Sequence, residues 1–79
     1  MIPGLNTNIE YDTFIWHIQT EDQGPGETCF VTHVFRDGAV VVTTRSDYGL
    51  ETALASKLRL QRKVHREIIE ALRAGHLTS

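Results

Sequence analysis

One cysteine and three of the four histidines are the residues whose types could support catalysis. Cys29 would need a nearby base or positive charge to act as a nucleophile at neutral pH. His17 and His33 lie in segments that we expect to form adjacent strands, so either could approach Cys29, and His65 lies further along the chain. However, Cys29 has apolar neighbours in a predicted strand, where a free cysteine usually acts as a small hydrophobic residue. We therefore predict no catalytic residue, and a small hydrolase or nuclease using His17 or His33 is the third-ranked hypothesis.

Residues suited to metal or cofactor binding are also sparse. The spacing of His17, His33 and His65 matches no usual ligand pattern, and a single cysteine excludes an internal disulfide. Glu21, Asp22 and Glu27 flank a Gly-Pro-Gly loop, where solvated carboxylates are a simpler interpretation than a cation site. The sequence contains no glycine-rich phosphate loop and no nucleophile elbow. We therefore predict no metal and no cofactor.

The first half of the chain has the pattern of an antiparallel sheet. Segments rich in β-branched and aromatic residues predict strands at about residues 8–11, 13–20, 28–36 and 39–45. Asp37-Gly38 is the strongest hairpin signal between them. The sequence predicts an α+β fold, in which a four-stranded antiparallel meander precedes one long C-terminal helix at about residues 50–74. All of residues 1–79 would form a single domain, with an N-terminal arm at 1–7, the sheet at 8–45 and a tail at 75–79.

Apolar residues occupy both faces of the predicted strands. Phe14, Trp16 and Ile18 share one face, where Trp16 is expected in the core, whereas Ile15 points to the other face. The segments 28–36 and 40–42 also carry apolar side chains on both faces. Because one helix can cover only one face, we expect the second face to contact another subunit or a partner.

The predicted helix is longer than the predicted strands. Ser46 and Asp47 could cap its start, and Gly75 could end it in the left-handed conformation. About 25 residues would span roughly 37 Å, whereas a seven-residue strand spans only about 23 Å. This difference predicts that part of the helix overhangs the sheet.

Basic side chains gather on one side of the predicted helix. At 100° per residue they fall within about 100° of one another, opposite Leu54, Ile68 and Leu72. They form the basic stripe, which consists of Arg59, Arg62, Lys63, Arg66 and Arg73. The basic stripe could bind a protein partner with an acidic surface or a nucleic acid. An isoelectric point near 6.0 counts against a dedicated nucleic-acid-binding protein.

A polar line interrupts the apolar side of the same helix. Lys57, Gln61 and His65 recur every four residues and form what we call the polar seam. Two apolar flanks on either side of the polar seam suggest two neighbours, although Lys57 and His65 could instead extend from the edge into solvent. We predict an oligomer interface on one flank, formed by Leu54, Leu58, Ile69 and Leu72. The other flank contains Ala53, Leu60, Val64 and Ala71.

Charge is distributed unevenly along the chain. Residues 1–47 carry seven acidic and two basic side chains, a balance of −5, and residues 48–79 carry six basic and three acidic ones, a balance of +3. Such polarity suits self-association or an anionic partner. The N-terminal residues have no signal-peptide pattern, and no apolar run approaches the length of a membrane span. We therefore expect a cytoplasmic protein that does not enter membranes.

Several segments resemble a group of small uncharacterised bacterial proteins. The similarity involves residues 6–11 (NTNIEY), residues 17–24 (HIQTED-x-G) and residues 32–35 (THVF), and it extends through residues 46–48 and 72–75. The resemblance implies a bacterial cytoplasmic protein and assigns no activity or functional residue.

Together these patterns favour a non-enzymatic, homo-oligomeric protein-interaction or scaffold module, with a homodimer as the expected form. It would use the second face of the sheet and the long amphipathic helix. Nucleic-acid binding through the basic stripe is the second hypothesis.

Overall fold

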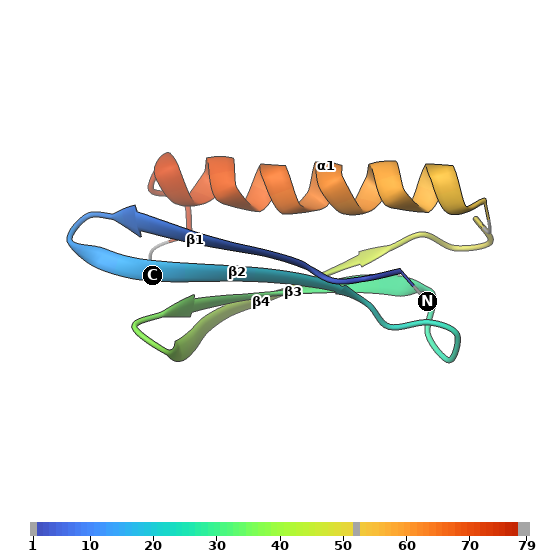
Figure 1. Ribbon diagram of the computed structural model, residues 1–79, viewed down its shortest axis with the longest axis horizontal. Coiled ribbons are helices and arrows are strands. Elements are labelled where there is room, and N and C mark those ends of the chain that lie inside the picture. Colours follow the sequence, from blue (N-terminus) through green and yellow to red (C-terminus); the bar gives the residue numbers. More distant parts are fainter. Residues whose placement is uncertain (1, 52, 78–79) are drawn as a thin grey trace.

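Each strand pairs with the next one along the chain. In a computed structural model that describes residues 2–51 and 53–77, strands β1 (Leu5–Tyr11), β2 (Phe14–Asp22), β3 (Cys29–Arg36) and β4 (Ala39–Asp47) form an antiparallel sheet in the order β1-β2-β3-β4. Helix α1 (Leu54–Arg73) follows and lies along one face of this sheet (Figure 1). The predicted α+β fold, a four-stranded meander followed by one C-terminal helix, is confirmed.

Strands β1, β2 and β4 are longer than the sequence pattern indicated, whereas β3 begins at Cys29, one residue later than predicted. Strand β1 begins at Leu5, inside the expected N-terminal arm, because Leu5 pairs with Thr20 of β2. Ile2, which precedes it, is buried. Strand β2 continues to Asp22, which pairs with Phe30 of β3. Backbone pairing therefore organises polar residues that local propensity assigned to loops.

Two-residue hairpins join β1 to β2 and β3 to β4. Asp37 and Gly38 have φ angles of 49° and 88°, the left-handed conformation that this type of turn requires. The hairpin predicted at this position is confirmed. Asp12 and Thr13 also have positive φ angles, 51° and 70°.

Helix α1 begins later than predicted, and its start is not capped by Ser46 or Asp47, which belong to β4. A turn at Gly49 follows, and a Glu51 carboxylate oxygen accepts the Ala53 N–H at 2.8 Å. At 20 residues the helix spans about 30 Å, close to the roughly 30 Å of a nine-residue strand. The difference in length from which the overhang was predicted is therefore absent. The predicted end is confirmed, because Gly75 has a φ of 78°.

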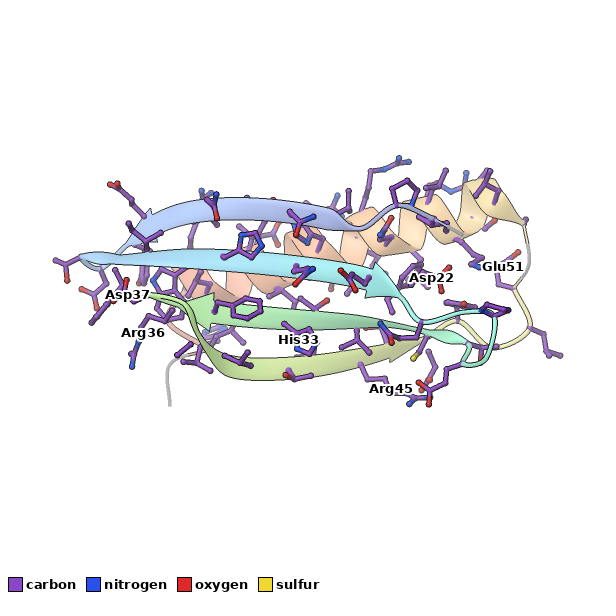
Figure 2. All side chains as sticks on the ribbon, turned by 60° about the horizontal axis from the view of Figure 1, so that its bottom comes forward. Asp22, His33, Arg36, Asp37, Arg45 and Glu51 are labelled. Carbon is purple, nitrogen blue, oxygen red and sulfur yellow. The ribbon has the colours of Figure 1, made fainter. Side chains whose placement is uncertain are left out.

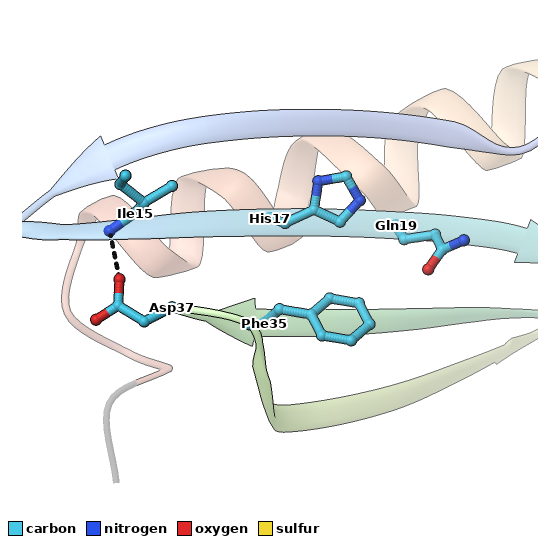
Figure 3. Close-up of a pocket in the computed structure, with 6 residues that line it drawn as sticks. Ile15, His17, Gln19, Phe35 and Asp37 are labelled. Atoms are coloured by element: carbon cyan, nitrogen blue, oxygen red, sulfur yellow. Dashed lines mark hydrogen bonds between the residues drawn. The ribbon is translucent and has the colours of Figure 1, made fainter.

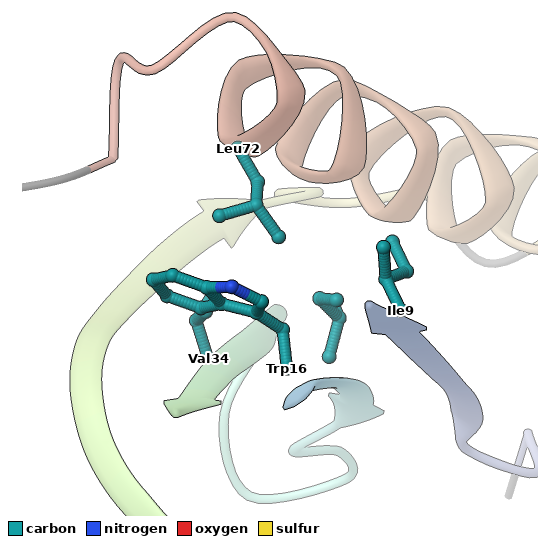
Figure 4. Packing of buried hydrophobic residues seen from close by; sticks show 5 residues of the cluster. Ile9, Trp16, Val34 and Leu72 are labelled. Carbon is teal, nitrogen blue, oxygen red and sulfur yellow. The ribbon is translucent and has the colours of Figure 1, made fainter. Parts of the chain in front are cut away.

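Apolar packing is concentrated under the C-terminal half of α1. Leu72 of the helix packs against Ile9, Trp16, Ile18 and Val34 of the sheet, and all five are buried (Figure 4). The Trp16 indole N–H donates to the Tyr11 carbonyl at 3.0 Å, so this ring is buried without losing its hydrogen bond. The core role predicted for Trp16 is confirmed.

The polar seam faces the sheet. His65 Nε2 lies 2.7 Å from Thr7 Oγ1 and its Nδ1 lies 2.8 Å from Thr20 Oγ1, while the Gln61 side chain donates to the Thr20 carbonyl at 3.2 Å. Thr20 Oγ1 is also 2.9 Å from Thr32 Oγ1. The interpretation that His65 extends from the edge into solvent was wrong, because this side chain is buried against the sheet. Threonine hydroxyls satisfy His65, and the backbone carbonyls of Pro3 and Thr20 accept from Gln61.

Lys57 completes the polar seam near the start of α1. Its ammonium lies 3.2 Å from Asp22 Oδ2 and 4.5 Å from the centre of the Tyr48 ring. The Tyr48 hydroxyl and the Gly24 N–H donate to Asp22 Oδ1 at 2.7 and 2.9 Å. Burial alone would raise the pKa of Asp22, but these hydrogen bonds and Lys57 outweigh it and hold the pKa below its usual value. This cluster ties α1 to the ends of β2 and β4.

Acidification should weaken the fold through His65. Burial, together with the charge of His17, lowers the pKa of His65 below its usual 6.5, so the unfolded chain binds this proton more readily than the folded chain does. The free energy of unfolding should therefore fall as the pH drops through 6.5. Thermal denaturation between pH 7.5 and 5.5 measures this slope. His65→Gln should flatten it, and His76→Gln, at an exposed position, should not; equal slopes in both variants would refute the assignment.

Candidate interaction surface

Except at its end around the buried Cys29, the sheet face opposite α1 is not covered by the described chain. Alternation along each strand sends one set of side chains toward α1 and the other set away from it (Figure 2). We call the second set the open face. It comprises Asn6, Asn8, Glu10, Ile15, His17, Gln19, Glu21, Val31, His33, Phe35, Val40, Thr43, Arg45 and Asp47.

Apolar and aromatic side chains occupy the centre of the open face. The Phe35 ring lies between those of His17 and His33, with ring centres 5.7 and 6.2 Å away. Ile15 on β2 and Val40 on β4 flank it and are 58% and 54% exposed. Phe35 and Val40 are cross-strand partners, and adjoining exposed apolar side chains are typical of interaction sites.

A shallow depression of about 440 Å³ lies beside Phe35 (Figure 3). Ile15, His17 and Gln19 of β2 form one side, and Phe35 with the Asp37-Gly38 turn forms the other. The Asp37 carboxylate accepts the Ile15 N–H at 3.3 Å, which fixes the turn against β2. The depression is therefore built from strand residues and a tight turn.

Two asparagines fix the orientation of His17. Its Nδ1 lies 2.7 Å from Asn8 Oδ1 and its Nε2 lies 3.2 Å from Asn6 Oδ1, both on the neighbouring strand β1. His33 is held in the same way from β4, because its Nδ1 lies 3.0 Å from Thr43 Oγ1. Rings held by their neighbours lose less conformational entropy on binding.

The charged side chains of the open face are mainly acidic. Glu10, Glu21 and Asp47 outnumber Arg45, a balance of −2. Arg45 is itself paired, at 3.0 Å to Asp47 and 3.7 Å to Glu27. This surface therefore favours partners with basic rather than phosphate groups around their contact region.

The basic stripe lies on the opposite side of the protein, on the outer side of α1. All five of its residues are exposed. Arg66 lies 3.7 Å from Glu70, and Arg59 donates to the Ser56 hydroxyl at 3.2 Å. Within residues 2–51 and 53–77, Arg62, Lys63 and Arg73 form no ion pair. The structure thus brings the predicted partner-binding residues together on one solvent-facing surface.

The four residues predicted to form an oligomer interface lie in different environments. Leu72 is fully buried in the core of its own chain, and Ile69 packs against that core. Leu58 is half-buried, and Leu54 is 63% exposed. Only Leu54 and Leu58 therefore retain much surface for another subunit, and an interface role for this flank stays a prediction.

The reactive residues considered from sequence do not converge. Cys29 is completely buried, and its thiol donates to a Glu27 carboxylate oxygen at 3.9 Å. Burial raises the pKa of this thiol, which disfavours the nucleophilic thiolate. His17 and His33 contact Phe35 and their strand neighbours instead. The described residues contain no group of three or more side chains placed to hold a metal ion.

Sequence reasoning did not identify Phe35, Asn6 or Asn8 as members of one surface. The signal that pointed to Phe35 was the apolar character of both faces of residues 28–36. The two asparagines gave no comparable signal, because their role depends on the β1–β2 register that places them beside His17.

Comparison with protein-family models, with curated proteins and with solved structures finds no match for this chain. Within residues 2–51 and 53–77, no helix is both long and apolar enough to cross a membrane.

Proposed function

We propose that this chain is a non-enzymatic, homo-oligomeric protein-interaction module that offers its open face to a partner protein. The observation that carries the proposal is an uncovered sheet face with a continuous apolar and aromatic centre, Ile15, Phe35 and Val40, inside a polar rim. Protein interfaces have this arrangement of an apolar core and a polar border. Cytoplasmic location and bacterial origin are part of the same proposal.

The small size of the chain supports self-association. A chain of 79 residues buries only roughly 60% of its unfolded surface, so its own core gives marginal stability. Association with a second copy stabilises the folded state by mass action. Self-association would also place two open faces in one particle and strengthen binding to a repeated or dimeric partner.

Selection from a random-peptide display library tests the role of the open face. Peptides bound by the wild-type protein should combine apolar with basic residues, because the apolar centre has an acidic rim. The affinity of these peptides for the double variant Ile15→Ser, Phe35→Ser should be at least about tenfold lower than for the wild-type protein. Leu50→Ser with Leu54→Ser is the matched control, since these side chains are 98% and 63% exposed away from the open face. Equal binding to both double variants would contradict the proposal.

Nucleic-acid binding is the second candidate, favoured by the clustering and exposure of the basic stripe. If this candidate is correct, an electrophoretic shift should be present at low salt and weaken steeply as salt rises. Arg62→Glu with Lys63→Glu should then abolish the shift, whereas Arg36→Glu, near the Asp37-Gly38 turn, should retain most of it. The protein-interaction proposal predicts no shift even at low salt, so this measurement separates the two functions.

A further inference from the structure

Strand β4 forms one edge of the sheet, and its register against β3 shifts at a bulge that leaves Val41 unpaired. From Ala39 to Thr44 it contains no charged residue and no proline. Val40 and Val41 are 54% and 39% exposed. Beyond the bulge, an uncharged edge segment of this kind is a template for pairing with another strand.

Backbone hydrogen bonds determine which groups of β4 point away from the sheet. Tyr48 N–H donates to the Thr28 carbonyl at 3.0 Å, and these two residues extend the β3–β4 register by one pair. Hydrogen-bonded and non-hydrogen-bonded pairs alternate in an antiparallel ladder. Even-numbered residues from 42 onward therefore bond to β3, and the N–H and C=O groups of Thr43, Arg45 and Asp47 point outward.

Thr44 provides an independent observation on the same strand. Its hydroxyl oxygen is buried, and it is the single buried side-chain oxygen or nitrogen in the described residues that has no hydrogen-bond partner. Such a group costs free energy until a donor or acceptor reaches it. Thr44 lies on the α1 side of β4, next to the exposed edge.

We propose that a second copy of this chain pairs with β4 in antiparallel orientation, about a two-fold axis at Thr44. This inference rests on the proposed self-association and specifies its interface. Thr43 of each copy would form a hydrogen-bonded pair with Arg45 of the other, through backbone groups that already point outward. Thr44 would face Thr44 of the second copy as a non-hydrogen-bonded pair, with Cα atoms about 4.5 Å apart. A rotation about χ1 then lets one threonine hydroxyl donate to the other.

Neighbouring registers of the strand pair either leave the Thr44 hydroxyl unpaired or bring like charges together. A two-fold axis at Thr43 would place Thr44 opposite Val42 and leave its hydroxyl unpaired. An axis at Arg45 would place two guanidinium groups directly opposite each other, which destabilises a strand pair. The axis at Thr44 avoids both problems.

The proposed pairing has a direct consequence for the open face. A two-fold axis perpendicular to the sheet keeps both α1 helices on one side and joins the two sheets into eight strands. The two open faces then form one continuous surface on the other side. The apolar centre of one open face would then lie at a fixed distance and orientation from the apolar centre of the second copy.

Proline at position 43 tests the pairing of the edge. The Thr43 N–H points outward, so Thr43→Pro removes no hydrogen bond from the β3–β4 ladder, and edge positions of this kind tolerate proline. Light scattering should show the mass falling from two chains to one. Thr43→Ala loses the same hydroxyl contact with His33 but keeps the N–H, and it should remain a dimer. A dimeric Thr43→Pro variant would overturn the inference.

Cysteine substitution tests the register without relying on proline. In a Cys29→Ala background, Thr44→Cys should give a covalent dimer on mild oxidation, because its Cα atoms face each other within disulfide range. Thr43→Cys faces an arginine and should cross-link far less. The inference is overturned if Thr44→Cys and Thr43→Cys cross-link equally, or if neither cross-links although the wild-type protein is a dimer. Self-association would still stand in both cases. A monomeric wild-type protein would refute the proposed homo-oligomer itself.

Discussion

Replacing Leu72 by alanine is expected to lower the free energy of unfolding by about 3 kcal/mol. The side chain is fully buried and is the one residue of α1 in the buried apolar cluster with Trp16 and Val34. Its loss would leave a cavity between the helix and the sheet. In a chain of this size such a loss is a large part of the total stability, so Leu72→Ala should be substantially unfolded in mild denaturant.

Leu54→Ala is the matched control for this prediction. It makes the same change in the same helix at a side chain that is 63% exposed, so its effect should stay within about 0.5 kcal/mol. Urea denaturation followed by circular dichroism measures both variants. A similar loss in the two would mean that α1 does not pack on the sheet through Leu72.

Replacing Asp22 by alanine should cost about 3 kcal/mol, the lower end of the range for breaking a buried ion pair. The carboxylate side chain is only 3% exposed and accepts from Tyr48, Gly24 and Lys57. Lys57 is 19% exposed and can reach water after the change, which limits the loss. The same urea titration measures it.

Asp47→Ala is the comparison for Asp22→Ala, because the Asp47 ion pair with Arg45 is exposed and should contribute less than about 1 kcal/mol. The pKa of Asp22 lies below its usual 3.8, so the difference between the two variants should persist from neutral pH to about pH 4 and shrink at lower pH. Equal destabilisation at pH 7 would show that the Asp22 cluster does not hold α1 in place.

Local sequence patterns predicted the features that local physics determines. Asp37-Gly38 requires positive φ angles, and Gly75 ends a helix in the left-handed region, so both were identifiable without tertiary information. The apolar alternation of β2 likewise placed Trp16 in the core. Strand ends were less predictable, because β1 extends to Leu5 through pairing with β2 and not through its own propensity.

The polar seam shows the limit of helical periodicity. Lys57, Gln61 and His65 were recognisable as a line on one side of the helix, but periodicity does not show what that line contacts. The complementary signal was in the strands, where Thr20 and Asp22 continue the same face as the buried apolar residues of β2. Only the register between α1 and β2 pairs the two polar lines, and this is a tertiary property.

The candidate surface was predictable as an uncovered face but not as a set of residues. Apolar side chains on both faces of β3 indicated that one helix would leave part of the sheet open. The depression beside Phe35 depends on cross-strand neighbours, and the outward backbone groups of Thr43 depend on the β3–β4 hydrogen-bond pattern. The open face and the edge of β4 carry the argument for self-association in place of the helix overhang.

Light scattering coupled to size-exclusion chromatography tests the central claim of homo-oligomeric assembly most directly. Across the micromolar concentration range the protein should elute with a mass of twice the 8.9 kDa of one chain, because two copies are expected to associate. A mass of one chain at every concentration would contradict the account.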